Sequence, residues 1–178
     1  MAVVGRLANW EQFFDLSKPA LRLSFVLQIL VLPAFYFVAM TANRAQAVAL
    51  GESPEDPKLS VIAIIGIVYL LSFSAVAYIL TMVFDCQDRL RPWIIVRHWC
   101  VFFLAWIAAA GFGLFSLGLL PLAAAYGIVF AAFMGSLIVD IRLVQRIVGF
   151  NWNVAILTAC LISVAGMSLL LTGLSQLS

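Results

Sequence analysis

Charge is scarce in this sequence: 10% of its 178 residues are Asp, Glu, Lys or Arg, whereas 65% are hydrophobic. Water-soluble domains contain about 25% charged residues, so the composition excludes an ordinary soluble domain. The longest uncharged stretch, residues 98–139, has no Asp, Glu, Lys or Arg in 42 positions. An apolar helix crosses a bilayer in about 20 residues. The stretch therefore predicts two membrane crossings, joined by a tight turn at Gly118–Pro121.

Residues that usually carry binding chemistry are also few. The three cysteines, Cys86, Cys100 and Cys160, are odd in number and far apart, which argues against a disulfide framework or a zinc site. His98 is the only histidine, so one chain cannot give haem two axial histidines. We interpret His98 as an interfacial residue, with a ligand role as the alternative. The net charge of +2, without a basic run, argues against nucleic acid as a partner.

Catalytic and ion-translocating groups are missing from the expected spans. The sequence has no Ser-His-Asp arrangement, no HExxH motif and no paired aspartates within a span. No carboxylate, lysine or arginine lies near the middle of a predicted span. Proton pumps, ion-coupled transporters and voltage sensors need such groups inside the membrane. We therefore predict a protein that is not an enzyme, has no cofactor and has no metal site.

Long apolar segments are what the sequence does contain. They predict an all-α fold, a polytopic transmembrane bundle of five spans at residues 21–42, 59–84, 93–117, 122–139 and 153–172. Pro33 should kink the first span, because proline removes a helical hydrogen bond. Residues 43–58 are expected to form the only sizeable loop. Gly149 should end the helix that continues after the fourth span, and Asn151 should cap the fifth.

The first twenty residues are expected to form a separate segment. Val3, Leu7, Trp10 and Phe14 recur at helical spacing among polar residues, which predicts an amphipathic helix. Such a helix lies in the headgroup plane or packs on the cytoplasmic ends of the bundle, and the pattern fits both. The break at residues 17–19 separates it from the first span.

Basic residues predict the orientation of the bundle. Five spans put the two termini on opposite sides of the membrane. Eight of the ten basic residues then share one side, which the positive-inside rule makes the cytoplasmic side. We predict a cytoplasmic N-terminus and an external C-terminus. The eight are Arg6, Lys18, Arg22, Arg89, Arg91, Arg97, Arg142 and Arg146, and the other two are Arg44 and Lys58.

A stripe of small residues is a candidate for helix packing. Ala123, Gly127, Ala131 and Gly135 recur at a spacing of four, and small residues allow membrane helices to approach closely. The simplest interpretation seats span 122–139 against the third or fifth span. The alternative is a seam between two copies of the chain.

A charged cluster is the second candidate site. Asp85, Asp88, Arg89, Arg91 and Arg97 lie near the cytoplasmic membrane surface in the predicted topology. Local salt bridges are the simplest account of this cluster. Its arginines could also bind anionic lipid headgroups. A metal or phosphate site formed with the two aspartates is the remaining alternative.

The order of these features resembles the Yip1 family of five-span membrane proteins. The likeness is carried by the first span with Pro33, the Gly118–Pro121 turn, and residues 143–149 leading into residues 152–155. The long cytoplasmic domain of eukaryotic members has no counterpart here. The resemblance implies a protein of the bacterial inner membrane and brings no catalytic residues.

Two functions follow as hypotheses from this pattern. The first is a non-enzymatic membrane protein that acts by lateral contacts, as a scaffold, assembly factor or accessory subunit. Its partners would be the lipid bilayer and other membrane proteins or a second copy of itself. The alternative is a small transporter or channel for a neutral or apolar solute, because Pro33, Gly111 and Gly113 provide places where helices can break.

Overall fold

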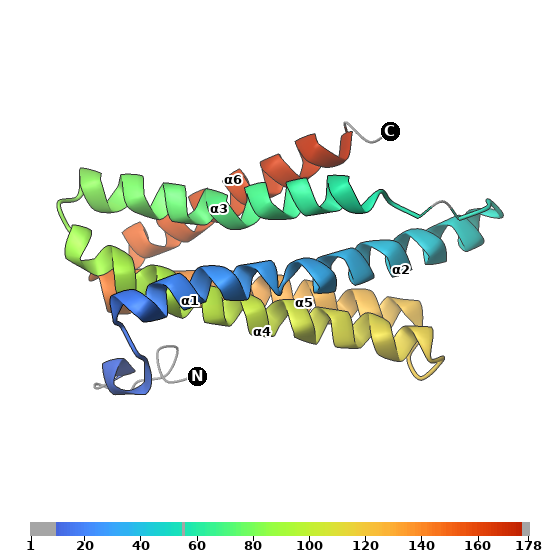
Figure 1. The fold of residues 1–178 in the computed structure, drawn as a ribbon, viewed down its shortest axis with the longest axis horizontal. Helices are drawn as coiled ribbons and strands as arrows, with labels where there is room; N and C mark the ends of the chain where they lie inside the picture. The colour runs from blue at the N-terminus through green and yellow to red at the C-terminus, as the bar shows by residue number, and fades with distance from the viewer. Residues whose placement is uncertain (1–9, 55, 176–178) are drawn as a thin grey trace.

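The computed structural model describes residues 10–54 and 56–175, and all regular secondary structure there is helical. The predicted all-α fold is therefore confirmed for these residues. The helices up to residue 143 run roughly along one direction, and the helix at residues 152–175 crosses them at an angle (Figure 1). The elements are η1 (Trp10–Phe13), α1 (Lys18–Ile29), α2 (Leu32–Leu50), α3 (Leu59–Val83), η2 (Gln87–Arg89), α4 (Leu90–Ser116), α5 (Leu122–Leu143), the π-helix η3 (Val144–Val148) and α6 (Trp152–Ser175).

Four helical segments are long and apolar enough to cross a membrane: Lys18–Leu50, Leu59–Val83, Gln87–Ser116 and Leu122–Val148. Within α6, the stretch Trp152–Gly166 is also apolar. Large apolar side chains cover the outside of the bundle; Ile64 and Phe130, for example, are 63% and 64% exposed. Such a surface is compatible with a multi-pass protein whose outer face meets lipid.

Local sequence signals set the helix ends, and those of Pro33, Gly149 and Asn151 were predicted from the sequence. Ser17 caps α1 by accepting a hydrogen bond from the Ala20 amide, with proline in the first turn. The helix is interrupted between Ile29 and Leu32, just before Pro33. At the other end of the chain, Gly149 ends η3 at φ +87°, and the Asn151 side chain accepts from the Val154 amide that opens α6.

Two boundary predictions differ from the structure. The expected loop at residues 43–58 is shorter, because α2 continues to Leu50 and ends at Gly51 in the left-handed conformation. Alanine, arginine, glutamine and leucine in residues 43–50 favour helix, which extends the first span by two turns. Residues 1–9 of the amphipathic helix predicted for residues 1–20 lie outside the described residues, and the short η1 is the one helical element described before α1.

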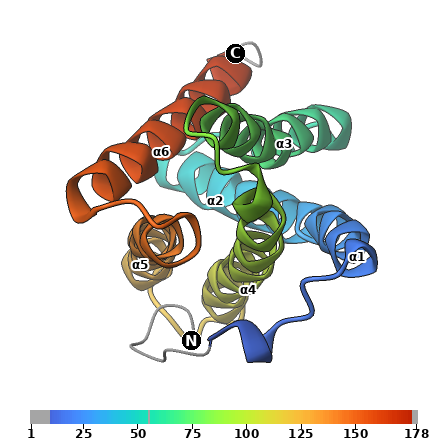
Figure 2. The ribbon, with the colours of Figure 1, turned by 90° about the vertical axis from the view of Figure 1, so that its left-hand side faces the viewer.

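The bundle is organised around α4. This helix packs against α1, α2, α3 and α5, while α6 closes the bundle by contacting α3 and α5. Seen along the bundle, α5 and α1 lie on either side of α4 (Figure 2). The helices α3 and α6 lie on the side of the bundle opposite α4 (Figure 2). Trp93 and Val96 of α4 are fully buried in a cluster with Leu143 and Val144. A cluster of buried apolar side chains therefore lies where the start of α4 meets the end of α5 and η3.

The small-residue stripe on α5 faces mostly outwards and is not packed against a neighbouring helix as predicted. Ala123, Gly127 and Ala131 are exposed, and a Cβ added at Gly127 would meet nothing within 4 Å. At the stripe's other glycine, Gly135, an added Cβ would lie 3.6 Å from the Leu104 side chain of α4. The spacing of four identified one face of the helix but not its neighbour, so seating against the third or fifth span is wrong for three of the four residues.

Close packing of α4 on α5 uses a different glycine. A Cβ added at Gly111 would lie 3.0 Å from the Ile128 side chain, whereas one at Gly113 would lie in open space. Ala125, with no exposed surface, is also on this inner face of α5. Small residues do bring the two helices together, as membrane packing requires, but at positions that the stripe did not include.

Candidate functional site: a polar interior in the helix bundle

A buried ion pair joins α4 to the end of α5. Arg97 Nε donates to Asp140 Oδ1 at 2.7 Å and Nη2 donates to Oδ2 at 3.2 Å, so the contact is bidentate. The two side chains are 6% and 2% exposed. The Arg97 guanidinium also lies over the Phe73 ring of α3, 3.9 Å from its centroid. Three helices therefore hold one arginine in a fixed position.

Arg97 lies inside the bundle rather than at its surface. It is the eighth residue of α4, about 10 Å along the helix from its start. The expectation that it belongs with the exposed charges of the η2 region is wrong, because its face of α4 turns towards α3 and α5. The other four members of that cluster are exposed, and Arg89 pairs locally with Asp88 at 2.9 Å.

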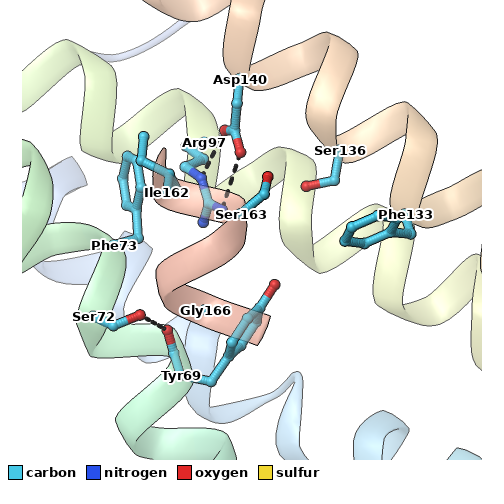
Figure 3. Close-up of a pocket in the computed structure, with 10 residues that line it drawn as sticks. All are labelled: Tyr69, Ser72, Phe73, Arg97, Phe133, Ser136, Asp140, Ile162, Ser163 and Gly166. Carbon is cyan, nitrogen blue, oxygen red and sulfur yellow. Dashed lines mark hydrogen bonds and ion pairs between the residues drawn. The ribbon is translucent and has the colours of Figure 1, made fainter. Parts of the chain in front are cut away.

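A cavity of about 60 Å³ lies beside the ion pair. Figure 3 shows hydroxyl-bearing and aromatic side chains from α3, α5 and α6 around it, with the ion pair at one side. The volume is sufficient for several water molecules, and polar groups are available to bind them. Its lining consists of Tyr69, Ser72, Phe73, Arg97, Phe133, Ser136, Asp140, Ile162, Ser163 and Gly166.

One wall of this cavity is set by a close contact between α3 and α6. A Cβ added at Gly166 would lie 2.8 Å from Cε2 of Tyr69, so the glycine leaves room for the tyrosine ring. Ser72 donates to the Tyr69 carbonyl at 2.6 Å, which satisfies its hydroxyl within its own helix. Ser136 and Ser163 come from α5 and α6 on the remaining sides.

His98 lies next to Arg97 in a second buried polar group. The His98 ring has no exposed surface, with Nδ1 3.0 Å from Ser24 Oγ and Nε2 3.5 Å from Ser74 Oγ. Its ring meets Phe25 edge-on, with centroids 4.8 Å apart. The predicted interfacial role for His98 is therefore wrong. It links α1, α3 and α4 through hydrogen bonds that satisfy both ring nitrogens.

The spacing of residues along α4 indicates which way the Arg97 side chain points. Arg97 precedes Val101, Ala105 and Ala109 at a spacing of four, and all three are buried. Asp140 likewise follows Ser136, which lines the cavity. The prediction that Arg97 lies near the membrane surface did not take this register into account. A charge that continues a buried stripe faces neighbouring helices rather than lipid headgroups.

The arrangement is suited to binding a small, neutral, polar molecule. Arg97 and Asp140 have opposite charges and hold each other, so the cavity has no unpaired charge. The serine hydroxyls can donate and accept hydrogen bonds. Among residues 10–54 and 56–175, no three His, Cys, Asp or Glu side chains gather as a metal site requires. Comparison with protein-family models, curated proteins and solved structures finds no match to this chain.

Proposed function

We propose that this chain is a five-span protein of the bacterial inner membrane, with its N-terminus in the cytoplasm and its C-terminus outside. The length of α6, 24 residues, supports a fifth span, since about 20 suffice. Arginines lie in the last turn of α5, in η3 and at the start of α4, whereas Arg44 and Lys58 lie near the end of α2 and just before α3. Residues 1–20 form its interfacial segment, and the resemblance to the Yip1 family suggests the inner membrane.

Within that membrane the protein acts as a small transporter or channel for a small neutral polar solute. The observation that carries this proposal is the cavity beside the buried Arg97–Asp140 pair. Ionisable side chains within membrane bundles are costly, and they mark solute or ion pathways. The expectation that the spans contain no charged interior group rested on placing both residues at the membrane surface.

Two interrupted helices support the same function, and one of them, α5, contributes residues to the cavity lining. The first span breaks between α1 and α2, and α5 passes into the π-helix η3 four residues after Asp140. Transporter sites are typically built at discontinuous helices, and π-helical turns are frequent at functional sites. Breaks of this kind allow a helix segment to move without unfolding the rest of the bundle.

Solute flux in liposomes tests the proposal. Purified protein is reconstituted, and stopped-flow light scattering follows volume changes in gradients of urea or glycerol, and in a sucrose gradient for water. We expect at least one of the three to cross faster than in protein-free liposomes. Ser163→Leu fills the cavity and should reduce the rate to the protein-free value.

A matched variant on the same helix provides the control. Ser168 is exposed on α6, outside the cavity lining, so Ser168→Leu should keep the wild-type rate. Ser163→Ala, which adds no volume, should also remain active. Rates for all three solutes equal to those of empty liposomes would contradict the proposal. So would equal rates for the two leucine variants.

A second candidate is the scaffold or accessory subunit expected from the sequence. The exposed small residues of α5 favour it, because Ala123, Gly127 and Ala131 leave a shallow, closely approachable face. Native mass spectrometry after mild extraction should then show a partner at constant stoichiometry. Gly127→Ile should release that partner without changing the fold, and a lone chain in the wild-type sample would count against this role.

A further inference from the structure

A second cavity, distinct from the Arg97–Asp140 site, lies between the first span and α3. Its volume is about 280 Å³. Gln28 is its one polar lining residue, and the others are Phe25, Ile29, Leu32, Ile67, Leu70 and Leu71. Ile29, Ile67 and Leu71 are 62%, 44% and 51% exposed on the outer face of the bundle. The groove is therefore accessible from the lipid side, and no charged side chain lines it.

Gln28 has one hydrogen-bonding atom without a partner. Its side chain is buried, at 5% exposure, and Nε2 donates to the His98 backbone carbonyl at 3.0 Å. A carbonyl can only accept, so this bond fixes which amide atom is nitrogen. Oε1 is buried and receives no hydrogen bond within the described part of the chain. A buried acceptor in an apolar environment is unfavourable until a donor reaches it.

We propose that this groove binds an apolar membrane molecule with one hydroxyl group, which donates to Gln28 Oε1. The apolar walls would hold its hydrocarbon part, and the unpaired oxygen selects a hydroxyl-bearing molecule over a plain hydrocarbon chain. A charged ligand is disfavoured because nothing in the lining would balance its charge. The class is therefore a lipid-soluble alcohol or phenol that enters from the bilayer.

The position of Gln28 gives such a ligand a direct link to α4. The same side chain that would bind the hydroxyl holds the His98 carbonyl, one residue from Arg97. The groove also borders the interruption between Ile29 and Leu32. The inference does not depend on the proposed transport function, because it rests on the groove and on Gln28 alone.

Photolabelling with a matched pair of probes tests the proposal. The protein is placed in phosphatidylcholine nanodiscs with a decyl alcohol that contains a diazirine, or with its methyl ether, which lacks the donor. After irradiation, peptide mass spectrometry maps the labelled residues. We expect saturable labelling of residues 25–32 and 67–71 by the alcohol, with an apparent affinity about tenfold higher than that of the ether, the effect of one hydrogen bond.

Two variants decide whether the groove and its acceptor are responsible. Gln28→Leu removes the acceptor and should reduce the affinity for the alcohol to that for the ether. Ile67→Trp fills the groove from its exposed rim, leaves Gln28 intact and should abolish labelling by both probes. Equal affinity of the two probes for the wild-type protein would overturn the proposal. Saturable labelling that persists in Ile67→Trp would do the same, even if Gln28→Leu failed to fold.

Discussion

Asp140→Asn is the substitution that should most strongly destabilise the bundle. It removes the negative charge while keeping the side-chain volume, so Arg97 stays buried without a counter-charge. Two charge-assisted hydrogen bonds are affected, at 2.7 and 3.2 Å. Breaking a buried ion pair by removing one partner costs about 3–5 kcal/mol. Counting each charged hydrogen bond at about 1.5–3 kcal/mol gives a similar sum, so we expect a loss of about 3–5 kcal/mol in the free energy of unfolding.

The assay is equilibrium unfolding in mixed micelles of a mild detergent and SDS, followed by circular dichroism. The double variant Arg97→Met with Asp140→Leu provides the rescue, because hydrophobic replacement of a buried pair is often neutral or stabilising. Asp56→Asn is the control. Asp56 pairs with Arg44, and the two side chains are 45% and 50% exposed. Exposed pairs of this kind contribute about 0–1 kcal/mol to the free energy of unfolding. A loss below about 1 kcal/mol for Asp140→Asn, or no rescue, would refute the reasoning.

Three further predictions concern glycines and one loop. Gly111→Ala should destabilise the bundle through the clash with α5, whereas Gly113→Ala on the same helix should be neutral or slightly stabilising, as measured by SDS unfolding. Gly149→Ala should cost about 1 kcal/mol or more in the same assay, because φ is +87° there. The hydrogen bond from Arg44 holds the pKa of the Asp56 carboxyl below its usual value of 3.8. At pH values above 3.8, Asp56 is charged and its pair with Arg44 stabilises the loop. As the pH falls through the lowered pKa, Asp56 becomes protonated and this stabilisation is lost. Hydrogen exchange in residues 51–58, corrected for intrinsic rates, should rise on acidification in the wild type and change less in Asp56→Asn.

Local signals explain why much of the fold could be predicted from the sequence. Pro33 and Gly149 act through their own backbone geometry, and Asn151 acts through a hydrogen bond to an amide three residues later, so these effects can be predicted without knowing the tertiary neighbours. The uncharged stretch at residues 98–139 likewise forms the α4–α5 hairpin, with Gly118 at φ +72° in the turn. Helix existence and helix ends depend on such short-range terms.

The candidate site could not be predicted in the same way, because it depends on which face of each helix meets which neighbour. Arg97 near a helix start is equally compatible with a membrane anchor and with a buried partner. Only the packing of α4 against α3 and α5 brings it to Asp140, 43 residues later in the chain. The stripe containing Gly127 failed for the same reason, since spacing defines a face but not its contact.

Transport through this bundle requires that water-soluble molecules reach the cavity beside Arg97 and Asp140. Cysteine accessibility in intact membranes measures this directly. In a chain whose three native cysteines are replaced, Ser136→Cys places a thiol in the cavity lining, and Phe130→Cys places one on the outer face of the same helix. We predict that a small, uncharged, water-soluble thiol reagent modifies the residue at 136 much faster than the one at 130, whose thiol faces the lipid and stays protonated. Equal rates at the two positions would contradict the account.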